Sequence, residues 1–231
     1  MLSRIDRWLG NGWMGIAELL VTVLCLFFSL SIHEFAHGYA AYKMGDDTAR
    51  NMGRLSISPF SHLDVVGALC MLLFGFGWAK PVPVNSRNFK PGKQKSGMMI
   101  TSVAGPVSNL LVCFLCCLVY SVMARCLDGV RLSMTAYRAF ELVVIMLNTL
   151  ISMNIGLAVF NLIPIPPLDG SKILSGVLPA RAYFRLMQYE RYGFLVLIIL
   201  MNTSIFGNTL NFMANKILSV FQWLIGLLPF L

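Results

Sequence analysis

The run His33-Glu34-Phe35-Ala36-His37 contains the residue types of a catalytic metal site in the spacing H-E-x-x-H. On a helix, side chains four residues apart lie on one face, so both imidazoles can bind one zinc ion from the same side. Glu34, one step round the helix, can then reach a water that the metal activates and take its proton. Such a water, with its pKa lowered from about 15.7 toward about 7, becomes hydroxide at neutral pH and can attack a peptide carbonyl.

The surroundings of this motif argue against a chance occurrence. H-E-x-x-H also occurs by chance in helices of soluble proteins, where its side chains face water. Here it lies in an apolar stretch, 8–42, that contains no lysine or arginine. An acid at the centre of a membrane helix costs about 2.5–3.5 kcal/mol. Solvation at a helix end would explain one ionisable group but not three in this order, so we interpret the three as a functional site.

A third metal ligand has to come from elsewhere in the chain. A catalytic zinc ion usually has three protein ligands and leaves the fourth position to water, and the chain has only three histidines. Asp169 is the acid that the pattern favours, because Pro164, Pro166 and Pro167 forbid regular helix just before it. Unwound backbone at membrane depth is tolerated only where it is buried in protein or lines a wet cavity. Asp169 could instead cap a helix that begins near Ser171. The other acids in or beside apolar runs are Glu18, Asp64, Asp128 and Glu141.

His62 and Asp64 are the rival ligands, in the run Ser61-His62-Leu63-Asp64. They follow Pro59 at the boundary between a loop and an apolar run, where polar residues cap helices and turn the chain. We interpret them as structural residues, and a role in metal binding stays open at this point.

The composition predicts that lipid surrounds the chain. Of its 231 residues, 57% are hydrophobic and 12% are charged, whereas an ordinary soluble domain has about 25% charged residues. The net charge of +8 comes from lysines and arginines between the apolar runs, a pattern typical of membrane loops near lipid head groups. We therefore expect no nucleic-acid partner. Cys113, Cys116 and Cys117 are interpreted as small packing residues between membrane helices rather than as metal ligands.

Charge-free runs define four candidate spans, since a helix needs about 20 apolar residues to cross a bilayer. The first starts near Trp13 and contains the H-E-x-x-H motif. The others are 96–124, 142–168, whose end is broken by the three prolines, and 192–215. The tail, 217–231, suits either an interfacial helix or part of a tilted span.

Residues 65–79 form an apolar run too short for an ordinary span, and three glycines interrupt it. We predict a re-entrant or partly buried segment there. The next residues, Lys80, Pro81, Val82, Pro83, Val84 and Asn85, suit an extended edge, because proline cannot donate to a strand ladder. The predicted fold is an all-α polytopic membrane protein with 4–6 transmembrane helices and a short β-like or re-entrant segment between the first two core helices. We expect the whole chain, 1–231, to form a single domain.

Three motifs in this order resemble the site-2 protease family of intramembrane metalloproteases, in its compact bacterial form. They are the H-E-x-x-H helix, the run 104–109 (Ala-Gly-Pro-Val-Ser-Asn) and the run 161–170 (Asn-Leu-Ile-Pro-Ile-Pro-Pro-Leu-Asp-Gly). Residues 78–85 resemble the same subgroup, so the resemblance covers nearly the whole chain. It implies that His33, His37 and Asp169 bind Zn²⁺ and that Glu34 is the general base. It also implies a helical core in which the two motif helices meet around zinc near the cytoplasmic side.

Two asparagines are further candidates. The resemblance implies that Asn161 helps to hold the substrate or the oxyanion, and a preorganised amide donor can contribute about 2.7–4 kcal/mol there. The alternative for Asn161 is an interhelical hydrogen bond, worth about 0.6 kcal/mol. Asn109 is a supporting candidate for substrate binding. Its alternative is helix packing, because it follows Gly105 and Pro106, where helices can approach closely.

These interpretations predict a zinc-dependent intramembrane endopeptidase, a multi-pass protein of a bacterial cytoplasmic membrane. A substrate helix would enter laterally, unwind, and lay an extended segment against 80–85 by strand addition. The expected partners are membrane-protein helices and the lipid bilayer, and an oligomer is compatible with the sequence. Two other classes stay open. A transporter would spread its charged residues over several spans, and a catalytically silent scaffold would lack the glutamate or a ligand.

Overall fold

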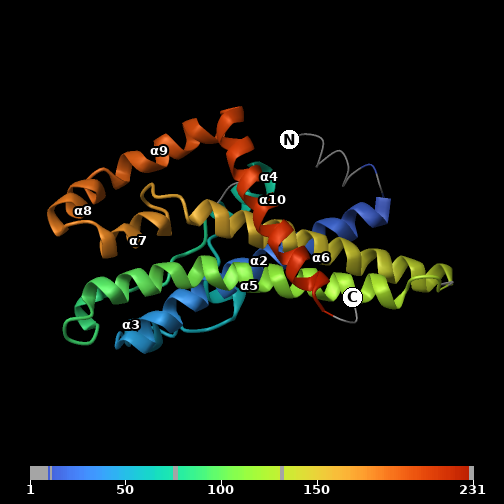
Figure 1. Cartoon of the computed structure of the whole chain (residues 1–231), viewed down its shortest axis with the longest axis horizontal. Helices are drawn as coiled ribbons and strands as arrows, with labels where there is room; N and C mark the ends of the chain where they lie inside the picture. Colours follow the sequence, from blue (N-terminus) through green and yellow to red (C-terminus); the bar gives the residue numbers. More distant parts are fainter. Residues whose placement is uncertain (1–9, 11, 75–77, 131–132, 229–231) are drawn as a thin grey trace.

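A computed structural model describes residues 10, 12–74, 78–130 and 133–228, and every regular element in that part of the chain is a helix (Figure 1). This confirms the all-α class. The helices are α2 (Gly12–Met44), α3 (Thr48–Asn51), η1 (Pro59–Ser61), α4 (Val65–Phe74), η2 (Ser86–Asn88), α5 (Gln94–Cys126), α6 (Met134–Asn161), α7 (Asp169–Val177), α8 (Ala180–Met187), α9 (Glu190–Met201) and α10 (Ser204–Gly226).

Three of these helices, α2, α5 and α6, are long and apolar enough to cross a membrane. They agree with the first three predicted spans and pack together, with α2 against both α5 and α6. Large apolar side chains stay exposed on their outer faces, among them Leu20, Leu111 and Leu115. Exposed apolar surface of this kind is stable against lipid rather than water. The chain is therefore a membrane protein.

The packed core between α5 and α6 is closed by α10. Cys113 on α5 lies against Ile155 and Val159 on α6, and all three side chains are buried. Cys113 thus packs as the sequence interpretation expects. The α10 residues against this core are Leu210, Ala214, Ile217, Leu218 and Phe221.

Residues 162–168 turn the chain between α6 and α7 without regular helix, as the prolines predict. Protein encloses this turn closely. A Cβ at Gly170 would overlap the carbonyl oxygen of Ile163, and one at Gly193 in α9 would overlap that of Pro166. The unwound stretch therefore meets the condition for irregular backbone at membrane depth, and it presents Asp169 as the first residue of α7.

The predicted fourth span, 192–215, is not one continuous helix. The structure has two helices there, α9 and α10, bent by 89° at the break between them. Asn202 donates a hydrogen bond to the carbonyl oxygen of Ile198 at 2.8 Å, and the Thr203 hydroxyl accepts one from the Phe206 N–H at 3.3 Å. These side chains bond to the backbone groups on either side of the break, so a helix can end and another begin.

Helix α10 continues to Gly226, so residues 217–226 belong to it and form no separate tail. The described residues hold three candidate spans, or four if α9 and α10 together form one.

The segment between the first two spans contains α4, and positions 75–77 of the predicted re-entrant run lie outside the described residues. Residues 78–85 form no strand in the structure. The reason is that three of their N–H groups donate to acceptors of the protein itself, at 2.9, 2.8 and 2.6 Å. The donors are Lys80, Val82 and Asn85, and the acceptors are, in the same order, the His62 carbonyl, the Glu34 carboxylate and the Asp46 carboxylate.

Asp46 fixes the end of this segment to the turn after α2. Its fully buried carboxylate accepts hydrogen bonds from the Asn85 N–H, the Asn88 amide at 2.9 Å, and the Thr48 N–H and hydroxyl. Burial alone would raise the pKa of Asp46, but these hydrogen bonds outweigh it and hold the pKa below its ordinary value. The carboxylate is therefore charged at neutral pH, and it joins 85–88 to α2.

Replacing Asp46 with alanine is expected to loosen residues 85–90, because hydrogen bonds to a charged group contribute about 1.5–3 kcal/mol. Amide hydrogen exchange at 85–90 is expected to become about 10–100-fold faster. In the native chain the stabilisation is complete above the pKa of an unfolded aspartate, about 3.9. This stabilisation by Asp46 is lost as the pH falls through the lower pKa of the folded state.

The matched control is Asp47→Ala, since Asp47 is half-exposed and makes only a 3.9 Å ion pair to Arg50. Unchanged exchange in Asp46→Ala would contradict this role.

Candidate functional site

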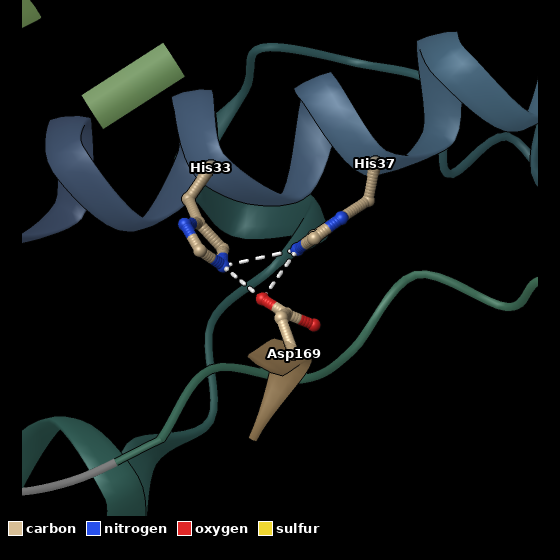
Figure 2. A group of neighbouring side chains, drawn as sticks. All are labelled: His33, His37 and Asp169. Atoms are coloured by element: carbon tan, nitrogen blue, oxygen red, sulfur yellow. Dashed lines mark hydrogen bonds and ion pairs between the residues drawn. The ribbon is translucent and has the colours of Figure 1, made fainter. Parts of the chain in front are cut away.

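The structure brings His33, His37 and Asp169 together at the contact between α2 and α7 (Figure 2). The two histidines lie one turn apart on α2 and point the same way, and Asp169 faces them from the start of α7. His33 Nε2 and His37 Nε2 are 3.0 Å apart, and they lie 3.1 and 3.0 Å from Asp169 Oδ2. All three side chains are buried.

The opposite nitrogen of each imidazole is held by an oxygen that can only accept a hydrogen bond. His33 Nδ1 lies 2.5 Å from Asn109 Oδ1, and His37 Nδ1 lies 2.7 Å from the Thr101 carbonyl oxygen. Each Nδ1 must therefore carry the proton, which leaves the Nε2 lone pairs directed at Asp169. Three electron pairs that converge within about 3 Å repel one another unless a cation lies between them.

This donor set fits zinc. Ligand atoms about 2.0–2.1 Å from a tetrahedral zinc ion lie about 3.3–3.4 Å from one another, close to the 3.0–3.1 Å separations found here. Two neutral imidazoles and a carboxylate are also a ligand set of catalytic zinc, with the fourth position open. Gly105 of α5 makes room for the rings, because a Cβ there would overlap His37 and come within 2.7 Å of His33 Cε1. The residues present therefore fit a bound Zn²⁺.

Lys172, which the sequence analysis missed, holds the other carboxylate oxygen. Its Nζ lies 3.4 Å from Asp169 Oδ1, while Oδ2 faces the histidines. The ammonium group thus keeps the two oxygens of Asp169 in separate roles. Helical spacing could have indicated this contact, since Lys172 is three residues after Asp169 in α7.

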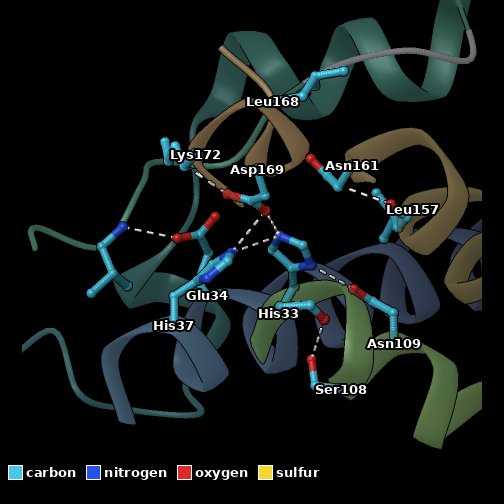
Figure 3. Close-up of polar contacts among 12 residues, drawn as sticks. His33, Glu34, His37, Ser108, Asn109, Leu157, Asn161, Leu168, Asp169 and Lys172 are labelled. Carbon is cyan, nitrogen blue, oxygen red and sulfur yellow. Dashed lines mark hydrogen bonds and ion pairs between the residues drawn. The ribbon is translucent and has the colours of Figure 1, made fainter. Parts of the chain in front are cut away.

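Glu34 lies beside the metal ligands and is held by the segment 80–85 (Figure 3). Its Oε2 accepts a hydrogen bond of 2.8 Å from the Val82 N–H. Val82 in turn packs on α2, where its Cγ1 would lie 3.1 Å from a Cβ at Gly38. The extended segment is therefore fixed next to the candidate general base.

A cavity of about 1160 Å³ opens beside these groups. Glu34, both histidines and Asp169 line it, as do Pro81, Val82, Val84 and Asn161 of the predicted substrate-binding and catalytic residues. Lys80, Pro83 and Asn85 are not among its lining residues. Tyr183 also lines the cavity. Burial and then the charge of Glu190 raise its pKa, so it stays a neutral hydrogen-bonding phenol.

The two candidate asparagines have different surroundings. Asn161 is the last residue of α6, and its amide donates to the carbonyl oxygen of Leu157 in its own helix at 3.0 Å. Its role toward a substrate stays a prediction. Asn109 is fully buried and bonds to His33, so it lies behind the metal ligand rather than in the cavity.

The rival ligands lie apart from this centre. His62 is buried and its Nε2 bonds to the Ser56 carbonyl oxygen at 2.7 Å. The Asp64 carboxylate accepts a hydrogen bond from the Gly67 N–H at 2.8 Å at the start of α4. Among the described residues, one group of three or more potential ligands is close enough to hold a metal ion, and neither residue belongs to it.

Comparison with known proteins identifies the family of this site. The model of peptidase family M50 matches residues 21–204, a stretch that includes both histidines, Glu34 and Asp169. The chain belongs to peptidase family M50. This confirms the resemblance to site-2 proteases that the three motifs indicated.

Curated M50 relatives match most of the chain. The proposed zinc metalloprotease YwhC of Bacillus subtilis (strain 168) is 40% identical over 194 residues, which cover 84% of this chain and 85% of that protein. The proposed zinc metalloprotease Rip2 of Mycolicibacterium smegmatis is 25% identical over 193 residues, covering 81% of this chain and 69% of its own. No solved structure matches the chain significantly. The M50 family and these relatives place the chain among metalloproteases.

Proposed function

We propose that this protein is a zinc-dependent endopeptidase that hydrolyses peptide bonds in or near transmembrane segments of other membrane proteins. The observation that carries the proposal is the meeting of His33, His37 and Asp169 beside Glu34 within a bundle of membrane-length helices. The ligands fit a tetrahedral metal with one open position, and the family consists of peptidases.

Zinc bound by these three residues would lower the pKa of a coordinated water toward about 7 and polarise the peptide carbonyl. Glu34 would then act through its carboxylate as general base, accepting the proton of the attacking water and passing it to the leaving amide nitrogen. Its hydrogen bond from the Val82 N–H holds one oxygen, Oε2, and leaves Oε1 for this proton transfer. Asn109 and the Thr101 carbonyl keep the proton of each imidazole on Nδ1.

The substrate would have to unwind, because a helical peptide bond has its carbonyl engaged and its flanks shielded. The cavity of about 1160 Å³ gives an extended segment room beside the metal ligands. Pro81, Val82 and Val84 line this cavity, which supports the proposal that residues 80–85 bind the unwound segment. Because Val82 also bonds to Glu34, a segment bound there would lie next to the general base. Asn161, on the same cavity, would contact the substrate or the oxyanion.

The site of action would be the cytoplasmic membrane of a bacterium, and the partners would be membrane-protein helices in the bilayer. The apolar outer faces of α2, α5 and α6 support the membrane setting. The transporter alternative loses support, since the one candidate group of metal-binding residues in the described part of the chain matches a peptidase site.

The direct test compares membrane-protein fragments in cells that contain the native chain with those in cells that contain Glu34→Gln. We expect fragments with new termini in or near transmembrane segments, present with the native chain and absent with the variant. The same purified proteins are assayed for zinc. A native chain that binds zinc but yields no such fragments would contradict the proposed substrate class.

A further inference from the structure

Three polar side chains that are fully buried lie behind the metal centre, one on each of the three long helices. Ser29 is on α2, Asn109 on α5 and Asn154 on α6, and each has 0% of its surface exposed. Polar groups buried among membrane helices are costly unless every one of them is paired. Here they pair with one another and with His33.

The hydrogen bonds between them run in one direction. His33 Nδ1–H donates to Asn109 Oδ1 at 2.5 Å, and Asn109 Nδ2 donates to Asn154 Oδ1 at 2.7 Å. Asn154 Nδ2 donates to Ser29 Oγ at 2.8 Å and to the Leu150 carbonyl oxygen at 2.9 Å. Ser29 Oγ donates to the Cys25 carbonyl oxygen at 2.7 Å. The chain of donors thus leads from the metal ligand to backbone carbonyls.

Those carbonyls decide the direction, because a carbonyl oxygen can only accept. The Leu150 carbonyl requires the NH₂ group of Asn154 on its side, so Asn154 Oδ1 faces Asn109. Asn109 must then turn its NH₂ group to Asn154, at 2.7 Å, and its Oδ1 to His33. The same NH₂ group also donates a longer hydrogen bond, of 3.4 Å, to the Ser29 carbonyl oxygen. His33 is left with its proton on Nδ1 and its lone pair on Nε2, which is the tautomer that binds a metal.

Without Asn154, only the 3.4 Å hydrogen bond to the Ser29 carbonyl oxygen would hold the Asn109 NH₂ group. The amide could then rotate more readily and present its NH₂ group to His33 Nδ1. The imidazole would then carry its proton on Nε2, and the lone pair that faces Asp169 would be lost. The carboxyl-terminal half of α6 would therefore control the metal affinity of a histidine on α2 without touching the metal.

We infer that Asn154 and Ser29 are positioning residues of the metal centre, which fix the tautomer of His33 through the amide orientation of Asn109. This inference rests on the proposed function, because it assumes that His33 binds zinc. It assigns a role to two residues that the motifs do not contain.

A purely structural role would also be expected of buried polar residues, so the test needs a matched pair. Ser31 provides one. Ser29 and Ser31 lie on the same helix, have 0% and 1% exposure, and each donates to the carbonyl four residues earlier, at 2.7 and 2.6 Å. They differ in that only Ser29 also accepts from Asn154.

The experiment measures the zinc affinity of the purified full chain by competition with a chelator. Asn154→Leu is expected to weaken zinc binding about tenfold, at the lower end of the 10–100-fold range for residues that support a metal ligand. Ser29→Ala is expected to weaken it about threefold, as for the loss of one interhelical hydrogen bond. Ser31→Ala is expected to leave it unchanged.

A second set of variants, made in the Asn109→Asp chain, distinguishes an effect of Asn154 on the orientation of residue 109 from an effect on helix packing. In Asn109→Asp, both carboxylate oxygens accept, so His33 Nδ1–H finds an acceptor whichever way the group is turned. Asn154 no longer sets the orientation there, so adding Asn154→Leu is expected to weaken zinc binding no further. A packing role for Asn154 would lower the affinity equally in both backgrounds and would overturn the inference.

The outcomes separate this inference from the proposed function. If the native chain bound no zinc, the proposed function would fail, and the inference with it. If the native chain bound zinc and both Ser29→Ala and Asn154→Leu bound it as tightly, only the inference would fail.

Discussion

Replacing Asp169 with alanine is expected to remove the bound zinc and peptide-bond cleavage together. Two imidazoles would remain, with Nε2 atoms 3.0 Å apart, and they would have lost the one anionic ligand that balances the charge of the ion. Loss of a residue that only supports a ligand costs about 10–100-fold in metal affinity or activity, so loss of the ligand itself is expected to cost more. Metal content per chain and cleavage of a membrane-protein substrate measure the two effects.

The matched control for this experiment is Asp64→Ala. Asp64 is the acid that the sequence offered as a rival ligand, and its carboxylate bonds to the Gly67 N–H instead. We expect this variant to keep its zinc. Native zinc occupancy in Asp169→Ala, or loss of zinc in Asp64→Ala, would show that the candidate metal centre is wrongly placed.

The metal-binding geometry was predictable because most of it is local in the sequence. Helical spacing alone puts His33 and His37 on one face of α2. Three prolines before Asp169 end α6 and place the acid at the start of the next helix, and the family resemblance indicated that it faces α2. The structure brings these residues together as the motifs predicted.

The polar residues behind the metal centre were not predictable in the same way. Asn154 reaches Asn109 only because α6 turns this face toward α2 and α5. That rotation depends on how three apolar helices pack, and their hydrophobic periodicity is weak because lipid-facing and buried positions are both apolar. The break at Asn202 and Thr203 was also not predictable from hydropathy, because the residues around it over 192–215 are mostly apolar. It depends on two local hydrogen bonds of these side chains to the backbone.

Replacing Glu34 with glutamine is expected to slow cleavage by about 10²–10⁴-fold, the usual contribution of a general base, while zinc content stays native. The two side chains have nearly the same shape, and a glutamine Oε1 can still accept the hydrogen bond from the Val82 N–H. Residues 80–85 therefore stay in place, and what is lost is the ability to accept a proton. Rates in liposomes that contain the purified chain and a membrane-protein substrate measure this effect.

Glu190→Gln is the control for the charge of the cavity, since Glu190 lines the same cavity from the start of α9. If the negative charge alone attracted the substrate, both variants would slow cleavage to a similar extent. If Glu34 accepts the proton, only Glu34→Gln loses the rate, and it does so at saturating substrate as well. A Glu34→Gln chain that cleaves at the native rate would remove the general base from the mechanism. A Glu34→Gln chain that loses its zinc would show instead that Glu34 supports the metal. A residue that acts only as a general base is not needed to hold zinc.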